Sequence, residues 1–542
     1  MGVKKTNRTV WAVRIAALSV FWGGDPVLGQ DLRDSGILRM FTSGSEIGRE
    51  RFVRTGEYLE TETIIPVLAV KVRTRATYRS GRLAAYRAEV FRLPHDSLLQ
   101  TYSALVENDS VKITHRAGGG ERRWSVAARV DAVAASQSLA AFGDLVHRAL
   151  GRDTAFSLWS AERNAALEVR VRHFGDSVVL VTDLLDITVR LGPTGRFQSF
   201  EIPAQRLKAE RAETMNLPPL AGLEPPRADY SAPPGAPYYA EEVRIPVRTS
   251  KGESFELAGT LTVPKTGAPP YPAVILITGS GAQDRDENLW PLVPEYRPFR
   301  DIADRLSREG FAVVRCDDRG FPPSGGSRDS ATMEDFAEDV IAQLAWLRSR
   351  PEIDGARVAL IGHSEGGVVG PMVAVRDSAV AAVVIMAGSA KPGIEVLRDQ
   401  LIWPIESAQG LPEERKRELK AKALEQLSSD TAGLSPWMRH FRYYDPLVAA
   451  RRLRQPVLIL HGALDRQVSV GQADTLARAI REGGNRDVTV RIFPRLNHLF
   501  LVSPSDGSPA EYATIRDTAV AGEVLEVLSR WLRERLGAQR PD

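Results

Sequence analysis

The sequence has a single cysteine, no long apolar run and almost no net charge, and each scarcity excludes a class of protein. Because Cys316 is the only cysteine among 542 residues, the chain cannot form an intramolecular disulfide. Cys316 ends the apolar stretch 311–316, which predicts a packed core thiol and not a nucleophile. No stretch approaches the roughly 20 uninterrupted apolar residues that a membrane-spanning helix needs, so an integral membrane protein is excluded.

The small net charge is concentrated at the start of the chain. Its formal value is +3, and residues 1–29 carry four basic residues against the single acid Asp25, so the remainder is close to neutral. A near-neutral chain lacks the basic surface that nucleic-acid binding requires, and we expect no nucleic-acid partner. Hydrophobic residues at 43% and charged residues at 26% are ordinary globular values, which excludes disordered, collagen-like and coiled-coil proteins.

Residues 1–29 combine a basic start, the apolar residues 15–22 and a group of small residues before position 30. This order is typical of a secretory signal peptide, and it predicts a secreted or periplasmic protein. Arg14 interrupts the apolar part, so a disordered or amphipathic N-terminus is the alternative interpretation.

Prolines are concentrated between residues 217 and 238. Such a stretch can form neither a helix interior nor a regular strand ladder, so it predicts a semi-rigid linker over residues 216–240. The linker separates an N-terminal domain, residues 30–215, from a C-terminal domain, residues 241–542. The prolines of this stretch are Pro218, Pro219, Pro225, Pro226, Pro233, Pro234 and Pro237.

The N-terminal domain alternates polar and apolar residues in short runs, as in residues 110–115 and 177–182. A period of two predicts half-buried antiparallel strands, so we expect a β-rich sandwich or partial barrel. Residues 132–150 have a helical pattern, and Gly118–Gly120 are typical of a hairpin turn. The domain shows no catalytic constellation, because its four histidines have no metal-ligand spacing. These histidines are His95, His115, His147 and His173.

In the C-terminal domain, short apolar runs without polar alternation are separated by helical patterns. Strands of this kind are covered on both faces, which predicts a mostly parallel, wound α/β sheet whose ligands lie beyond the carboxyl ends of the strands. The expected strands are residues 273–277, 311–314, 357–361, 380–386, 456–460 and 488–492.

The sharpest motif is G-x-S-x-G at Gly362–Gly366, directly after the expected strand 357–361. A serine hydroxyl is a poor nucleophile unless it is presented to a base. A strained turn between strand and helix presents it in this way, and the flanking glycines permit the close backbone packing. The motif predicts Ser364 as the nucleophile.

A nucleophilic serine needs a histidine to accept its proton and a carboxylate to orient that histidine, and after such a turn the chain order is serine, acid, histidine. Asp465 and His498 follow two successive expected strands, so they lie at the same sheet edge as Ser364. His461 and His440 are rivals for the base. His461 is too close in sequence to the acid to be its natural partner and is expected to be structural.

A tetrahedral intermediate also needs two backbone donors for its negative oxygen. We expect the N–H of Glu365, immediately after the nucleophile, and the N–H of Ser280 in the loop after strand 273–277, with Gly281 as the next candidate. A phosphate-binding loop is disfavoured because no Gly-Lys-Ser/Thr follows.

With these motifs, residues 241–537 resemble the α/β-hydrolase fold, and closely the bacterial two-domain carboxylesterases of the serine-hydrolase or aminopeptidase-like type. The resemblance implies Ser364, Asp465 and His498 as a catalytic triad, and neither a cofactor nor a metal. The matching motifs are Gly279–Asp286 (GSGAQDRD), Asp317–Gly320 (DDRG), Gly362–Gly367 (GHSEGG), Leu464–Val468 (LDRQV) and Leu496–Phe500 (LNHLF).

Residues 391–450 lie between the expected strands 380–386 and 456–460 and have helical patterns, so we expect a helical lid over the nucleophile. Aromatic side chains of the lid are candidates for the substrate pocket, although packing at the surface is the alternative. They are Trp403, Trp437, Phe441, Tyr443 and Tyr444.

These residues predict a serine hydrolase that cleaves small-molecule carboxylic esters through an acyl-enzyme. The same triad could serve an exopeptidase, an amidase or a thioesterase, and for a peptidase the acids Glu365, Glu406, Glu413 and Glu414 could bind a free amine. A propeller peptidase is excluded, because the N-terminal domain is short and lacks repeats of 40–50 residues. An inactive hydrolase domain serving as a ligand-binding scaffold is the alternative of another class. No feature of the sequence indicates an oligomeric state.

Overall fold

The computed structural model describes residues 33–538 with gaps inside this range. The gaps are residues 43–44, 67–69, 80–81, 94–96, 108–109, 118–119, 128–129, 135–137, 150, 161–164, 183–185, 204–206, 218–228, 290–292, 294, 329, 409–410 and 430–433. The signal peptide predicted at residues 1–29 lies outside the described residues. So do four of the linker prolines, His95 and the first two glycines of the expected hairpin at 118–120.

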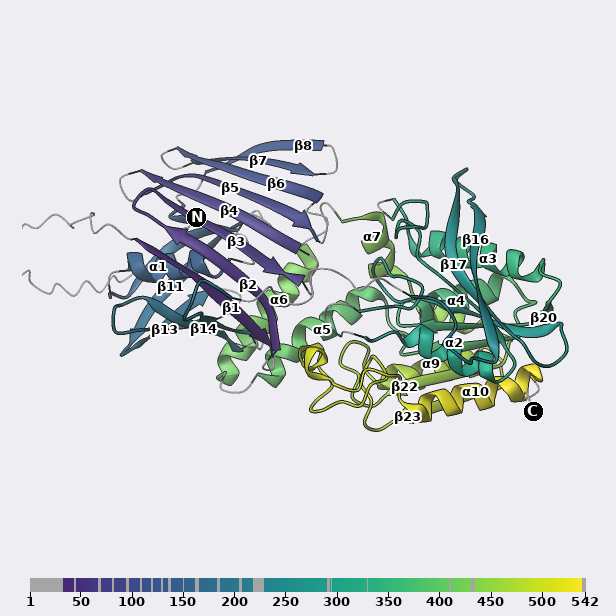
Figure 1. Ribbon diagram of the computed structural model, residues 1–542. Helices are drawn as coiled ribbons and strands as arrows, with labels where there is room; N and C mark the ends of the chain where they lie inside the picture. Colours follow the sequence, from purple (N-terminus) through teal and green to yellow (C-terminus); the bar gives the residue numbers. More distant parts are fainter. Residues whose placement is uncertain are drawn as a thin grey trace, which may run out of the picture.

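The described residues form two β-sheets from successive parts of the chain (Figure 1). The first has 15 strands and the second has eight. The strands of the first sheet are β1 Asp34–Thr42, β2 Ser45–Arg54, β3 Tyr58–Ile65, β4 Val70–Arg79, β5 Arg82–Arg92, β6 Ser97–Glu107, β7 Ser110–Ala117, β8 Gly120–Ala127, β9 Ala132–Ala134, β10 Thr154–Ser160, β11 Ala165–Phe174, β12 Ser177–Thr182, β13 Asp186–Leu191, β14 Phe197–Ile202 and β15 Leu207–Arg211.

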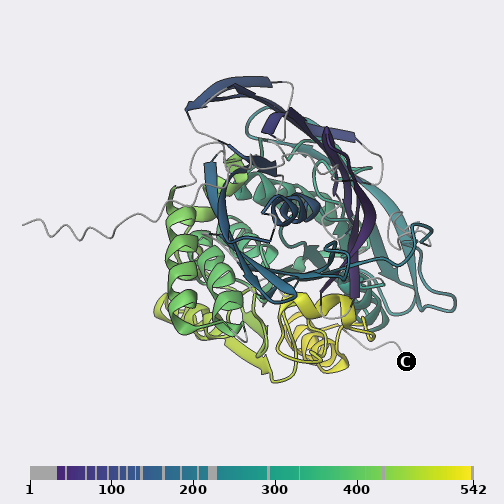
Figure 2. The ribbon, with the colours of Figure 1, turned by 90° about the vertical axis from the view of Figure 1, so that its left-hand side faces the viewer.

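The first sheet is one curved layer wrapped around helix α1, Ala140–Arg148 (Figure 2). Its strand order runs from β8 down to β1, then across to β15 and down to β9, so the pairing of β1 with β15 joins the two arms. The layer is therefore a partial barrel and not a sandwich. The helix is shorter than the pattern at 132–150 predicted, because Ala132–Ala134 pair as a strand with β10.

Buried carboxylates attach α1 to the inner face of this sheet. Glu50 of β2 accepts hydrogen bonds from the backbone N–H groups of Leu139 at 2.8 Å and Ala140 at 3.0 Å, at the start of the helix. At the middle of the helix, Asp144 accepts hydrogen bonds from Arg54 Nε at 2.6 Å and Tyr78 OH at 2.9 Å. Side chains of the sheet thus hold the helix at its start and at its middle, in addition to its apolar packing.

The second sheet is mostly parallel and has helices on both faces. Its order is β16-β17-β19-β18-β20-β21-β22-β23. Strand β17 is antiparallel to both of its neighbours, β16 and β19, and the other pairs are parallel. Its strands are β16 Tyr238–Arg248, β17 Ser254–Pro264, β18 Tyr271–Ile277, β19 Ala312–Cys316, β20 Ile353–His363, β21 Ala382–Met386, β22 Val457–Gly462 and β23 Val488–Phe493. This is the α/β-hydrolase fold that the motifs implied. The sequence patterns missed β16 and β17.

Side chains of the buried strands divide between two apolar layers. On β18, Ile275 packs with α3 Met333–Arg348, α4 Gly366–Arg376, α8 Pro446–Ala450 and α9 Gly471–Glu482 on one face. The neighbouring Leu276 packs with α2 Pro298–Arg308 and α10 Gly522–Leu536 on the other. A strand covered on both sides needs no polar alternation, which explains the continuous apolar runs.

Helices α5 Gly393–Ser407, α6 Glu413–Ser429 and α7 Pro436–Tyr443 form the insertion between β21 and β22 (Figure 1). Helix α6 touches the first sheet, because Arg415 donates hydrogen bonds to the Thr182 carbonyl at 2.5 Å and to Asp186 Oδ1 at 2.6 Å. A short 3₁₀ helix, Pro509–Thr514, precedes α10. None of the described helices combines the length and the apolar character needed to cross a bilayer.

The first prediction concerns the pH dependence of the N-terminal domain. Burial raises the pKa of Glu50 to about 7, against the opposing effect of its hydrogen bonds. A folded-state pKa above the unfolded value of 4.5 means that stability is greatest below pH 4.5 and is lost as pH rises through 7. A Glu50→Gln variant should therefore gain about 2–3 kcal/mol relative to the wild type between pH 5 and pH 8.

Urea unfolding of both proteins at the two pH values measures this difference. Glu62→Gln is the matched control, because Glu62 lies on the next strand in an exposed pair with Arg73 and should change stability by less than about 0.5 kcal/mol. Equal pH dependence in wild type and Glu50→Gln would contradict the assignment.

Candidate active site

The turn after β20 holds Ser364 in a strained backbone conformation. Its φ is 54°, which is rare for a residue with a side chain, and its N–H donates to the Met386 carbonyl at 2.8 Å. The turn requires the glycines of the motif. A Cβ on Gly362 would lie 2.0 Å from the Gly366 carbonyl oxygen, and one on Gly366 would lie 2.1 Å from the Ile277 carbonyl oxygen.

The structure brings Ser364, His498 and Asp465 into one chain of hydrogen bonds. His498 Nδ1 lies 2.7 Å from Asp465 Oδ2, and His498 Nε2 lies 3.1 Å from Ser364 Oγ. Because the carboxylate can only accept, Nδ1 carries the ring proton and Nε2 is left to accept the serine proton. The three side chains come from the loops after β20, β22 and β23 at one edge of the sheet.

Asp465 is fully buried but held in its ionised form. Burial by itself would raise its pKa, but the nearby His498 and the hydrogen bonds from His461 and His498 hold the pKa well below the ordinary value. Its second oxygen, Oδ1, accepts the N–H groups of Gln467 and Val468, both at 2.8 Å. This carboxylate is thus available to orient His498 over the whole range of pH in which esters are commonly hydrolysed.

The two rival histidines, His461 and His440, do not contact Ser364. His461 is completely buried, with Nε2 2.8 Å from the Val468 carbonyl and 3.2 Å from Asp465 Oδ2, so it supports the acid from behind. His440 lies on α7, stacked on Tyr444 and 3.8 Å from Glu334. Neither makes a hydrogen bond with Ser364.

The two backbone groups expected to hold the negative oxygen lie on neighbouring loops. Ser280 follows β18, and Glu365 stands at the N-terminus of α4. The Ser280 hydroxyl and the Glu365 carboxylate are hydrogen bonded, so the two loops are in contact. Within the part of the chain that the structure describes, neither backbone N–H has a hydrogen-bond acceptor. Both donors are therefore free to bind a ligand.

A cavity of about 260 Å³ opens at Ser364 and His498. Two of the five aromatic residues predicted for the pocket, Trp437 and Phe441, line it and stack on each other with ring centroids 5.2 Å apart. The other three do not line it. Tyr443 is 65% exposed, the Trp403 ring lies against Arg466, and Tyr444 packs between His440 and the core. Within α7, residues 437 and 441 share one face of the helix, whereas Tyr443 lies on another.

Glu365 connects the lid to the nucleophile turn. Its carboxylate is buried and accepts a hydrogen bond from Trp437 Nε1 at 2.5 Å. Burial raises the pKa of this carboxyl above its ordinary value, against the hydrogen bonds from Trp437 and Ser280. No sequence pattern indicated this contact, because residues 365 and 437 are brought together only by the folding of the insertion.

Sequence reasoning also missed two buried residues beside the nucleophile, Glu287 and His363. His363 Nδ1 lies 2.9 Å from Glu287 Oε1, and both residues line the cavity. His363 stands inside the G-x-S-x-G motif and Glu287 directly follows the GSGAQDRD motif, so their positions were visible, but their pairing was not. Among the described residues, no group of three or more His, Cys, Asp or Glu side chains could hold a metal ion.

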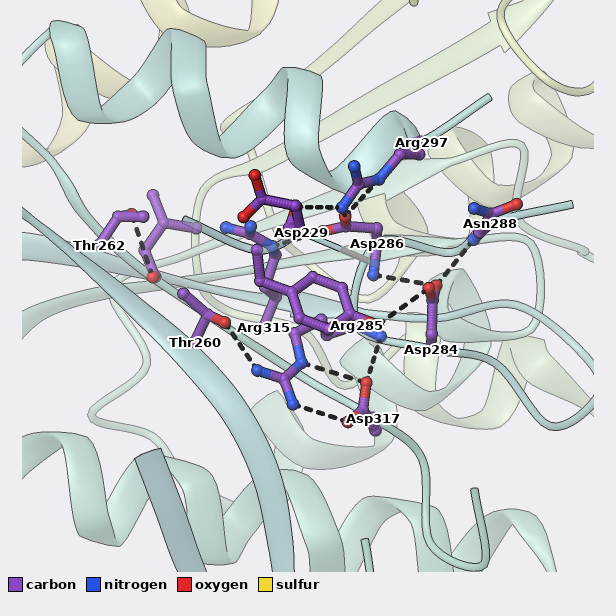
Figure 3. A network of polar contacts seen from close by, with 12 residues as sticks. Asp229, Thr260, Thr262, Asp284, Arg285, Asp286, Asn288, Arg297, Arg315 and Asp317 are labelled. Carbon is purple, nitrogen blue, oxygen red and sulfur yellow. Dashed lines mark hydrogen bonds and ion pairs between the residues drawn. The ribbon is translucent and has the colours of Figure 1, made fainter. Parts of the chain in front are cut away.

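Buried ion pairs hold the segment that follows Ser280, at Arg285 and Asp286 (Figure 3). Arg285 donates to both oxygens of Asp317, at 3.1 and 2.8 Å, and its guanidinium lies 4.2 Å from the centre of the Tyr230 ring. Asp286 accepts hydrogen bonds from Arg297 and Arg315, both at 2.7 Å. These charges, which lie within the GSGAQDRD and DDRG motifs and on the adjacent elements, fix the loop in place.

Comparison with known proteins agrees with this fold. Residues 274–514 match the model of the "Alpha/beta hydrolase family". Esterase EstD of Thermotoga maritima is 31% identical over 294 residues, which cover 52% of this chain and 68% of EstD. The uncharacterized peptidase YtmA of Bacillus subtilis is 24% identical over 34% of this chain and 63% of its own.

A solved structure of the Pyrococcus furiosus esterase Pf2001 aligns with a TM-score of 0.38 and 19% identity, covering 57% of this chain and 97% of that one. The order and direction of the strands in the second sheet, and the match to the family model, are those of an α/β hydrolase. The chain belongs to the alpha/beta hydrolase family. This membership and the similarity to esterase EstD support an enzyme with esterase-type activity acting on a small molecule.

The second prediction tests the ion pairs behind the Ser280 loop. Replacing Arg285 by Met leaves the buried carboxylate of Asp317 without its cation, so the variant should lose about 3–5 kcal/mol of unfolding free energy. Arg530→Ala is the control, since Arg530 makes an exposed pair with Glu526 on α10 and should cost less than about 0.5 kcal/mol. Urea unfolding distinguishes the two, and equal stabilities would show that the buried pair does not hold the loop.

Proposed function

We propose that this protein is a secreted or periplasmic serine hydrolase that cleaves carboxylic esters through an acyl-enzyme. The observation that carries the proposal is the hydrogen-bonded chain from Ser364 Oγ through His498 to Asp465, at 3.1 and 2.7 Å. The assignment to the periplasm or the exterior is drawn from the signal-peptide pattern of residues 1–29.

In the proposed reaction, Ser364 Oγ attacks the ester carbonyl carbon while its proton passes to His498 Nε2. The N–H groups of Ser280 and Glu365 bind the oxyanion. Collapse of the tetrahedral intermediate breaks the bond to the alcohol oxygen, which takes the proton from His498. A water molecule then attacks the acyl-enzyme, gives one proton to His498, and releases the acid as that proton returns to Ser364. Asp465 keeps the imidazole oriented and stabilises its charged form.

The cavity supports an ester with an apolar acyl or alcohol group. Its walls include Leu289, Val396 and Leu397 together with the stacked pair Trp437 and Phe441. Apolar side chains of this kind favour binding of hydrocarbon by removing it from water. The similarity to esterase EstD supports the same substrate class.

The peptidase alternative has less support. Three of the acids considered for binding a free amine lie on the lid outside the cavity: Glu406 pairs with Lys420, and Glu413 and Glu414 lie on the exposed side of α6. Glu365 does line the cavity, but its carboxylate already accepts hydrogen bonds from Trp437 and Ser280. The inactive-scaffold alternative is disfavoured by the hydrogen-bonded arrangement of Ser364, His498 and Asp465. A thioesterase would use the same chemistry, and nothing in the cavity selects for it.

The third prediction addresses the nucleophile. Ser364→Ala should lower kcat by at least about 1000-fold, because the triad side chains act as one unit. The measurement uses p-nitrophenyl butyrate, with aminoacyl p-nitroanilides in parallel to compare esters with amides. A fluorophosphonate probe should label the wild type and not the variant. Near-normal ester hydrolysis by purified Ser364→Ala would refute the mechanism, and faster turnover of the anilides would favour the peptidase.

The fourth prediction concerns the cavity wall. Trp437→Ala should shift the preference toward longer acyl chains by about tenfold in kcat/KM, because it removes a large side chain from the pocket and the added methylenes gain buried contact. A series of p-nitrophenyl esters from acetate to decanoate measures the shift. Tyr443→Ala, on the exposed side of the same helix, is the matched control and should leave the profile unchanged. An unchanged profile in Trp437→Ala would remove this residue from the pocket.

A further inference from the structure

We propose that Glu287 and His363 form a positioning pair that aligns the Ser280 loop, the nucleophile turn and the loop of the histidine base for catalysis. This inference rests on the esterase function proposed above and names two residues that the triad mechanism does not use. Both are buried, with 3% and 6% of their surfaces exposed, and both line the cavity at Ser364.

The pair contacts each of the three loops. Glu287 Oε1 accepts a hydrogen bond from the N–H of Gly279 at 2.6 Å, at the residue before the oxyanion donor Ser280. The same oxygen lies 2.9 Å from Nδ1 of His363, the residue before Ser364. His363 Nε2 lies 3.0 Å from the backbone carbonyl of His498. One buried ion pair therefore joins the immediate neighbours of Ser280 and Ser364 to the backbone of the base itself.

The chemistry of the contacts indicates that His363 is charged. Its two ring nitrogens both face acceptors, a carboxylate and a carbonyl, so both carry protons. Burial acts to lower the pKa of His363, but the charge and hydrogen bond of Glu287 outweigh it, and the pKa is raised. A neutral amide at either position would keep some hydrogen bonds but lose the attraction that draws the loops together.

The packing leaves little freedom around this pair. A Cβ on Gly279 would lie 2.8 Å from Glu287 Oε1 and 3.3 Å from Ser364 Cβ, so the Gly279 backbone fits closely between the carboxylate and the nucleophile. On the other side of the pair, the His363 and His498 rings lie with centroids 5.0 Å apart. A displacement of Glu287 would therefore be transmitted directly to the reacting groups.

The backbone of Glu287 is strained, and the neighbouring ion pairs maintain the strain. Its φ is 57°, and its N–H donates to the Asp284 carbonyl at 2.9 Å. The preceding residues, Arg285 and Asp286, are locked by the ion pairs drawn in Figure 3. Strain that is held in place by surrounding structure is concentrated at functional sites, because it places a side chain where a relaxed backbone would not.

Stability alone does not account for the pair. Glu287 Oε2 is buried and has no hydrogen-bond partner among the described residues, which carries a desolvation cost. Replacing a buried ion pair by well-packed apolar side chains is commonly neutral or stabilising. The pair thus lowers folding stability at the junction of the three loops. In return, it aligns the groups that stabilise the transition state.

The test is the steady-state kinetics of Glu287→Gln and His363→Gln on p-nitrophenyl butyrate. Each should lower kcat about 10–100-fold with KM within about twofold, because the pair orients groups that act in the transition state and does not bind the ground state. The double variant should lose no more than the worse single variant, since the two residues act as one unit. Affinity for a trifluoromethyl ketone, which forms an oxyanion at Ser364, should fall by the same factor as kcat/KM.

Glu309→Gln is the matched control, because Glu309 is a buried carboxylate that pairs with Arg305 away from the cavity, and it should keep wild-type kinetics. His363→Gln keeps the test decisive if Glu287→Gln fails to fold. Wild-type kcat in the folded variants, or reduced kcat with unchanged inhibitor affinity, would overturn the positioning role. A wild-type enzyme inactive on esters would instead overturn the proposed function.

Discussion

Loops at the carboxyl edge of the second sheet carry charges that are removed from water, and the pairing of these charges determines how the site is arranged. Asp465 is ionised in the interior because two histidines and two backbone N–H groups surround it. Asp317 is matched by Arg285, and Glu287 by His363. An unpaired charge in such surroundings would cost several kcal/mol, so each pair restricts the loop that bears it. These paired charges therefore determine where the proposed nucleophile, base and oxyanion donors lie.

The two domains meet through the lid and through the 3₁₀ helix Pro509–Thr514, which contacts β1 and β2. Helix α6 binds the first sheet through Arg415 and Asp186, and α7 reaches the nucleophile turn through the hydrogen bond from Trp437 to Glu365. The lid thus contacts both the partial barrel and the catalytic edge. A contact of this kind gives the N-terminal domain a physical connection to the cavity wall, although none of its own described side chains lines that cavity.

Much of the fold was readable from local patterns. The strands before Ser364 and Asp465 end in continuous apolar runs, because both of their faces are covered. The strand before His498 lies at the edge of the sheet and is only partly buried. All three run parallel, and the carboxyl ends of parallel strands meet at one edge. Strands β16 and β17 were missed because they lie at the antiparallel edge, where β16 alternates between buried and exposed residues. The helix expected at 132–150 was too long because residues 132–134 are apolar enough for a helix but are drawn into a strand by pairing with β10.

The sequence by itself determined which residues could do chemistry: a serine in a glycine-flanked turn, then an acid and a histidine after later strands, in the order that such a sheet requires. Only the tertiary structure decided which other side chains meet them. Trp437 and Phe441 line the cavity while Trp403, Tyr443 and Tyr444 do not. Glu287 lies against His363, which is 76 residues away in the sequence. Such contacts join segments that are far apart along the chain. The local sequence pattern indicates whether a residue is buried. Which residue it contacts depends on how distant segments pack together, and no single segment specifies that.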